Sequence, residues 1–170
     1  MNRFDSPCIS SFSGRYFFLS NYFPHSFVYK GIKYLSSEAA FHAQKDESRA
    51  KEFEFLTPNR AKRLGRLVKL RPDWEDVKKS IMKDILIEKF SDKKLRQKLI
   101  ETYPYTLIEG NDWGDKYWGV DFKTQEGQNN LGKILMEIRK EIIDGVLKYA
   151  EPYIDTDIAQ QLAQEVFKNA

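Results

Sequence analysis

Cysteine and histidine are scarce in this sequence. Its 170 residues contain one cysteine, Cys8, and two histidines. One cysteine cannot form an internal disulfide, and so few thiol and imidazole ligands fall short of a typical structural zinc site. We therefore expect a cytoplasmic protein, from a reducing compartment, and we predict neither a metal nor another cofactor.

Long apolar runs are also missing. The segment from Met1 to Pro7 holds no apolar signal core, and no stretch approaches the roughly 18 consecutive apolar residues that a membrane helix needs. The formal net charge is only +3. This argues against a broad nucleic-acid surface, so a DNA-associated protein is the weaker hypothesis, and a local phosphate site remains open. We expect neither secretion nor a membrane partner.

The apolar content that is present suffices for one core. With 41% hydrophobic residues in a chain of this length, we expect a single domain over residues 1–150. We expect residues 151–170, where Pro152 marks the break, to add an amphipathic helix that packs on this domain or on a second subunit. The oligomeric state stays open between a monomer and a homodimer.

Apolar spacing predicts an α+β, mainly helical single domain with a small N-terminal β element. A hairpin is expected around Lys30 and Gly31, and the segment from Asn111 to Gln128 is predicted to be a long loop. Helices are expected from Ser36 or Ser37 to about Phe55, from Pro58 to Arg71, after Asp73, after Asp92 and from Asn129 or Asn130, with asparagine as an ordinary N-cap. The lysines of the helix after Asp73, among them Lys89, are interleaved with acids and are expected to face solvent.

One helical face carries several reactive side chains. If the helix runs to about Phe55, then Glu38, Phe41, His42 and Lys45 lie on one face of it. Spacing alone favours the plain alternative, a Glu38–His42 surface pair. At the start of a helix, however, a carboxylate stays ionised near neutral pH, which suits the activation of water or the stabilisation of a cation.

Two further segments have a functional and a structural interpretation. The loop segment Trp113 to Asp121 has aromatic rings that could stack a flat heterocycle, or that could plug the core. After this loop, Asn130 lies at a helix start, where backbone N–H groups could bind a phosphate. Six cations fall within twelve residues without an acid, and they could bind phosphate or form a solvated helix face: Arg60, Lys62, Arg63, Arg66, Lys69 and Arg71.

Taken in order, these segments resemble the NADAR (YbiA-like) N-glycosidase family over roughly residues 12–143. The resemblance includes the Ser-Asn of Asn21, the Ser-Glu of Glu38 and the Gln-Lys of Lys45. In the family, a tryptophan precedes Pro-Ser-Glu and a histidine follows the glutamate, whereas this chain has Tyr34-Leu35 and Ala39 there. Further matches are Ala61 to Arg66, Arg71 to Trp74, Lys89-Phe90, Leu107 to Glu109, Tyr117 to Gly119 and Asn130 to Met136.

The resemblance implies hydrolysis of an N-glycosidic bond between a ribose and a nitrogenous base. The implied substrates are small phosphorylated ribosyl compounds, such as the ribosylamino-pyrimidine phosphates of riboflavin synthesis, or ADP-ribosyl compounds, including ADP-ribosylated guanine in nucleic acid. A non-catalytic ADP-ribose or nucleotide-binding module is the alternative.

The resemblance also assigns roles to residues. Glu38 becomes the catalytic carboxylate, Asp121 stands for an acid after the Trp-Gly pair, and Lys45 is a candidate for a Schiff base with a ring-opened glycosylamine. The predicted substrate-binding residues are Asn21, Arg63, Trp74, Trp118, Gly119 and Asn130.

Overall fold

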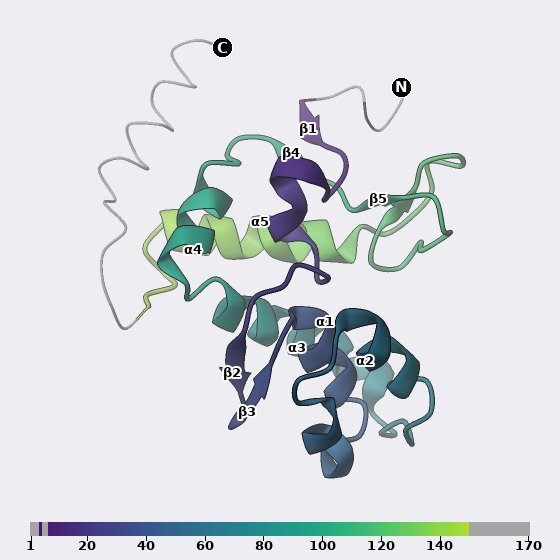
Figure 1. Ribbon diagram of the computed structural model, residues 1–170. Coiled ribbons are helices and arrows are strands. Elements are labelled where there is room, and N and C mark those ends of the chain that lie inside the picture. Colours follow the sequence, from purple (N-terminus) through teal and green to yellow (C-terminus); the bar gives the residue numbers. More distant parts are fainter. Residues whose placement is uncertain (1–3, 5–6, 150–170) are drawn as a thin grey trace. The chain divides into compact units, whose positions relative to one another are not determined.

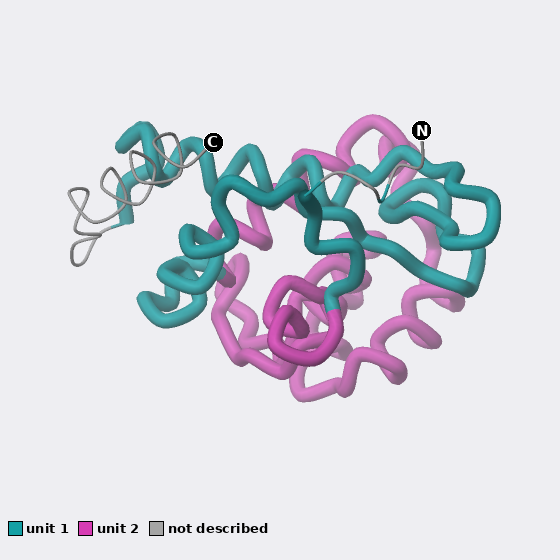
Figure 2. Tube along the Cα trace, turned by 90° about the horizontal axis from the view of Figure 1, so that it is seen from above, with its two compact units in different colours: residues 1–12, 90–170 teal, residues 13–89 magenta. Residues whose placement is uncertain are grey.

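The computed structural model describes residue 4 and residues 7–149 (Figure 1). The chain divides into two compact units, which Figure 2 colours separately. Unit 2 is the continuous stretch of residues 13–89, and unit 1 takes residues 1–12 and 90–170. The predicted C-terminal helix, residues 151–170, lies outside the described residues.

Unit 2 begins with a short helix, which the sequence did not predict, and with the predicted hairpin. The 3-10 helix η1 (Gly14–Leu19) precedes strands β2 (Phe27–Tyr29) and β3 (Ile32–Tyr34), which pair antiparallel with Phe27 opposite Tyr34. Lys30 and Gly31 form the turn with φ of 48° and 78°. Two positive φ values in a two-residue loop match the twist of the flanking strands, and glycine adopts this conformation without strain.

Helix α1 (Ser37–Ala43) begins where expected and ends earlier than expected. The Ser36 hydroxyl accepts the Ala39 N–H at 3.1 Å, which caps the helix start. The prediction that the helix runs to about Phe55 is wrong. The Lys45 carbonyl instead accepts the Arg71 N–H at 2.9 Å, and Asp46 is extended and starts a separate 3-10 helix, η2 (Glu47–Phe53).

Helix α2 (Pro58–Leu64) starts at the predicted Thr57-Pro58 pair but stops well before Arg71. Gly65 is its C-cap, and the next two peptides, Arg66 and Leu67, donate three residues back in a tight turn. Glycine is a poor helix former, so a break at Gly65 is physically reasonable. Helix α1 packs on α2, η2 and α3 (Trp74–Lys89), which places the start of α1 inside unit 2 (Figure 1).

Unit 1 combines two short parallel strand pairs with two helices. Strand β1 (Cys8–Ile9) pairs with β4 (Thr106–Leu107), and β5 (Gly110–Asn111) pairs with β6 (Val120–Asp121). Helix α4 (Lys93–Ile100) is capped by Asp92, as predicted, and packs on α5 (Asn130–Ile143), which also contacts β4. The apolar spacing of α5 is confirmed, because Leu135 and Ile138 are fully buried.

The start of α5 corrects one prediction about capping. Asn129 occupies the N-cap position, but its φ is 53° and its side chain makes no capping hydrogen bond. The side chain instead binds the backbone at the end of β4 and just after it: Nδ2 donates to the Leu107 carbonyl at 2.9 Å, and Oδ1 accepts the Glu109 N–H at 3.0 Å. Asn129 therefore fixes the chain that leaves β4 against the start of α5.

The mainly helical α+β class with a small N-terminal β element is confirmed. Strands are two or three residues long, and helices carry most of the burial in both units. Within the described part of the chain, no helix is long and apolar enough to cross a membrane.

The close contact at Gly132 gives a test of the α5 start. A Cβ at this position would lie 2.2 Å from the Leu107 carbonyl oxygen and 2.6 Å from the Asn129 amide. We expect Gly132→Ala to lower the free energy of unfolding by about 1–3 kcal/mol, because the backbone oxygen cannot move aside cheaply. Urea denaturation measures the loss. Lys133→Ala, on the exposed side of the same turn, is the matched control, and an equal loss in both variants would contradict the explanation.

Candidate functional site

A buried acid and a buried imidazole lie in the first two turns of α1. Glu38 and His42 are 9% and 7% exposed, and His42 Nε2 lies 2.9 Å from Glu38 Oε1. The sequence-based alternative of a surface pair is therefore wrong, because both partners are shielded from bulk water. Hydrogen bonds of this kind are stronger away from solvent.

The backbone of Glu38 is held by Asn21. The Glu38 N–H donates to the Asn21 carbonyl at 3.0 Å, and the Ser37 hydroxyl donates to Asn21 Oδ1 at 2.9 Å. Asn21 Nδ2 in turn lies 3.5 Å from Met82 Sδ of α3. Asn21 thus connects the start of α1 to the preceding loop. Its role in substrate binding stays a prediction.

Lys89 extends this support and corrects the expectation that it faces solvent. It is fully buried, and its Nζ donates to the Ser20 carbonyl at 2.8 Å. The sequence contains a signal for the burial of Lys89, because Lys89 follows the apolar residues Ile81 and Ile85 at spacings of four residues on one face of α3. A buried ammonium thus fixes the residue next to Asn21.

Lys45 follows α1 directly, half-buried beside Trp74. Its Nζ lies 5.8 Å from the centre of the Trp74 ring and 3.5 Å from the Gly65 carbonyl oxygen. Burial is the main cause that lowers the pKa of Lys45 below its usual range. The Glu38 carboxylate opposes this effect, and the nearby cations Arg66 and Lys62 add to it. A lowered pKa increases the fraction of neutral amine, which is the nucleophilic form.

The other two predicted residues of unit 2 differ in exposure. Trp74 is 6% exposed, and its ring lies 5.0 Å from that of Phe41 on α1. It therefore supports the helix that carries Glu38 and covers one side of Lys45. Arg60 and Arg63 are exposed on α2, which agrees with a solvated helix face, and Arg66 is exposed in the turn that follows the helix.

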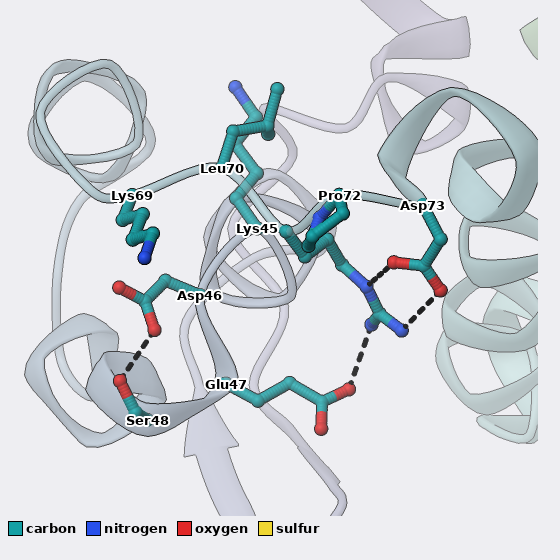
Figure 3. A pocket seen from close by; sticks show the side chains of 9 residues that line it. Lys45, Asp46, Glu47, Ser48, Lys69, Leu70, Pro72 and Asp73 are labelled. Atoms are coloured by element: carbon teal, nitrogen blue, oxygen red, sulfur yellow. Dashed lines mark hydrogen bonds and ion pairs between the residues drawn. The ribbon is translucent and has the colours of Figure 1, made fainter.

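An open hollow of about 440 Å³ lies next to Lys45 (Figure 3). The Arg71 guanidinium donates to Asp73 at 2.6 and 3.0 Å and to Glu47 at 3.0 Å. These two carboxylates balance the positive charge of Arg71. The hollow is lined by Lys45, Asp46, Glu47, Ser48, Lys69, Leu70, Arg71, Pro72 and Asp73, and Glu38 is not among the lining residues.

Four predicted residues lie in unit 1, around the chain between β5 and α5. Asp115 Oδ1 accepts the N–H groups of Tyr117 and Trp118 at 3.0 and 2.9 Å, and the half-buried Trp118 ring stacks edge-on against Tyr117 at 4.9 Å. Gly119 has no room for a side chain, because a Cβ would lie 2.2 Å from the Glu109 carbonyl oxygen. The close approach that glycine permits here is to the protein's own backbone.

Asp121 and Asn130 both make hydrogen bonds to the loop backbone. Asp121 Oδ1 accepts the N–H groups of Lys123 and Thr124 at 2.9 and 2.8 Å. The hydrogen bond from Thr124 is the main cause that holds the pKa of Asp121 below its usual range. Asn130 Nδ2 donates to the Tyr117 carbonyl at 2.8 Å. Both residues shape the loop, whatever their part in catalysis or binding.

Within unit 2 the structure links Asn21, Glu38, Lys45 and Trp74, and within unit 1 it gathers Trp118, Gly119, Asp121 and Asn130. His42, Lys62 and Arg66 join the first group, although the sequence assigned no site role to His42. No cluster of three or more His, Cys, Asp and Glu side chains that could hold a metal ion occurs in the part of the chain that the structure describes.

Comparisons with known proteins identify the family of this chain. The NADAR domain model matches residues 3–143, across both units. The N-glycosidase YbiA of Shigella flexneri serotype 5b is 36% identical over 129 residues, which cover 72% of this chain and 79% of that protein. A riboflavin biosynthesis protein of Vibrio vulnificus is 35% identical over 131 residues, covering 74% of this chain and 35% of that protein. The NMR structure of Escherichia coli YbiA has a TM-score of 0.72 at 34% identity, over 86% of this chain and 89% of that one.

The two hydrogen bonds accepted by Asp121 predict different effects of two substitutions. In Asp121→Asn the amide oxygen can still accept both N–H groups but carries no charge, so we expect a melting temperature between those of the wild type and Asp121→Ala. Asp121→Ala should melt at a lower temperature. Because the folded-state pKa is depressed, this stabilisation is present above the unfolded-state pKa of about 4 and is lost as the pH falls through the folded-state value.

Thermal melts from neutral to acid pH measure this difference. The gap between Asp121→Ala and wild type should shrink as the pH falls. A gap that is constant with pH would mean that the charge of Asp121 does not stabilise the turn.

Proposed function

Because this chain belongs to the NADAR domain family, we propose that it hydrolyses the N-glycosidic bond between a nitrogenous base and a ribose that is phosphorylated or part of ADP-ribose. The enzyme class is that of its bacterial relatives named N-glycosidase, the hydrolases of N-glycosyl compounds. The observation that carries the proposal is the buried Glu38 carboxylate, held at 2.9 Å by His42 and coupled to the half-buried Lys45.

In the first route, Glu38 acts as an anion. Cleavage of the ribosyl C–N bond moves the bonding electrons to the base and leaves positive charge on the sugar, which a nearby carboxylate stabilises. Water then adds to the sugar carbon, its proton passes to a carboxylate or to the leaving base, and the products are a free base and a ribose hydroxyl. We keep Asp121 as the proposed second carboxylate of this route.

In the second route, Lys45 acts as a nucleophile. A glycosylamine opens its ring to an imine, and the neutral Lys45 amine adds to the sugar carbon. The base leaves as an amine, and water hydrolyses the new imine to release the sugar and regenerate Lys45. Partial burial and the cations Lys62 and Arg66 favour the neutral amine that this step needs. Glu38 would then stabilise the iminium ion.

Charge around Lys45 supports a substrate that carries phosphate. Lys62 on α2 and Arg66 in the turn after it lie close enough to Lys45 to lower its pKa, and the exposed Arg63 is next to Lys62 on α2. Guanidinium groups bind phosphate in bidentate fashion. Two substrates fit: an early ribosylamino-pyrimidine phosphate of riboflavin synthesis, or ADP-ribosylated guanine, free or in nucleic acid. The riboflavin-related name of the Vibrio relative favours the first.

Four wider predictions belong to the same proposal. We place the enzyme in the cytoplasm, with a small-molecule substrate and no membrane partner, as a monomer or a homodimer. The single cysteine supports a reducing compartment.

Glu38→Gln tests the central claim. The amide is nearly isosteric but carries no charge, so we expect kcat to fall by at least about 100-fold on the substrate that the wild type hydrolyses. Both substrate classes are assayed by release of the free base. Glu75→Gln, an exposed acid of α3 paired with Lys78, is the matched control and should keep full activity. Equal activity of Glu38→Gln and wild type would remove Glu38 from the chemistry, and binding without turnover by the wild type would leave a nucleotide-binding module.

Borohydride reduction during turnover separates the two routes. If Lys45 forms an imine with the sugar, reduction leaves a stable covalent adduct that mass spectrometry locates on Lys45, and Lys45→Arg forms none and loses turnover. Lys69 lines the same hollow as Lys45. Its variant Lys69→Arg should therefore form the adduct and turn over substrate as the wild type does. Full activity of Lys45→Arg without any adduct would eliminate the Schiff-base route and leave the first.

A further inference from the structure

The second histidine of the chain makes a contact that the mechanism above does not require. His42 lies one helical turn after Glu38, and its ring is buried against Phe41 and the α2 end at Gly65. Its side chain is 9% exposed, so the ring is not available as a surface group. Its one polar contact among the described residues is Glu38 Oε1.

The unbonded ring nitrogen of His42 identifies the tautomer. Nδ1 is buried and has no hydrogen-bond partner among the described residues. A proton on Nδ1 would bury a donor without an acceptor, which costs more than an unused lone pair on one side of a ring. The proton therefore belongs on Nε2, where it is donated to the Glu38 carboxylate.

Gly65 makes this orientation possible. A Cβ at residue 65 would lie 2.4 Å from His42 Nδ1 and 2.9 Å from Cγ of the same ring. Any other residue at this position would push the ring out of its place. The C-cap of α2 thus provides the space that the His42 ring fills while it reaches Glu38.

The hydrogen bond distinguishes the two oxygens of Glu38. Oε1 accepts the imidazole N–H, whereas Oε2 has no protein partner in the described part of the chain. The backbone of Glu38 is fixed by Asn21, and the bond to His42 is the one hydrogen bond to its carboxylate among the described residues, with Lys45 as a nearby opposite charge. Ala39, which follows Glu38, has no donor group to replace it.

We infer that His42 is the positioning residue of the enzyme: it donates its Nε2–H to Glu38 Oε1 and so holds Oε2 toward the reacting sugar carbon. The inference rests on the proposed function in one respect, because it takes Glu38 as the carboxylate that acts on substrate. His42 itself touches no substrate, and its effect passes through the orientation of Glu38.

Steady-state kinetics of two His42 variants test the inference. His42→Leu keeps an apolar side chain of similar size but has no donor, so we expect kcat to fall about 10- to 100-fold while KM changes little. His42→Gln offers an amide N–H from the same helical position and should recover most of kcat. Circular dichroism at the assay temperature confirms that both variants are folded. Equal kcat in Leu and Gln variants would overturn the inference.

A double-mutant comparison separates positioning from general structural damage. If His42 acts only through Glu38, then His42→Leu has no further effect on the residual activity in the Glu38→Gln background. An equal loss in both backgrounds would make His42 a packing residue only. Full activity of His42→Leu beside an inactive Glu38→Gln would overturn the inference and leave the proposed function standing.

The tautomer can be observed without turnover. The chain has two histidines, so His42→Leu assigns the signals, and long-range nitrogen–proton NMR correlations distinguish a protonated Nε2 from a protonated Nδ1. We expect the Nε2–H form for His42 in the wild type and loss of that fixed form in Glu38→Leu. A wild-type His42 that carries its proton on Nδ1, or that exchanges between both forms, would contradict the inference even if Glu38 proves catalytic.

Discussion

The hydrogen bond from the Glu38 N–H to the Asn21 carbonyl fixes the position of the candidate catalytic carboxylate. A helix start has free N–H groups, and here one of them is satisfied by a loop residue and not by a side-chain cap. The loop is fixed in turn by the buried Lys89 ammonium on the Ser20 carbonyl. A buried lysine of α3 thereby helps to fix where an acid on α1 lies.

The same region accounts for the state of Lys45. Because α1 ends at Ala43, Lys45 leaves the helix and comes to rest beside Trp74, with its own carbonyl bonded to Arg71. There burial lowers the pKa of its amine, which favours the nucleophilic form that the second route needs.

Much of this could be predicted from the sequence. Apolar periodicity located α3, α4 and α5, and turn residues located the hairpin at Lys30 and Gly31, because these signals are local. The extent of α1, the burial of Lys89 and the bridging role of Asn129 could not be predicted from local signals. Each depends on a partner distant in sequence: Arg71 for Lys45, Ser20 for Lys89, and Leu107 for Asn129. For the site, family resemblance pointed to Glu38 and Lys45, whereas the contact between Glu38 and His42 became informative only once both were seen to be buried.

The division of the chain bears on the order in which it folds during synthesis. Residues 13–89 form one unbroken unit, so every partner of Glu38 within that unit is synthesised before α4. Strand β1 is different, because Cys8 pairs with Thr106 and must wait for it. Closing a loop of that length costs entropy before any strand contact compensates for it. The half of the protein that holds Glu38 and Lys45 can therefore be complete while the earliest residues of the chain are still unpaired.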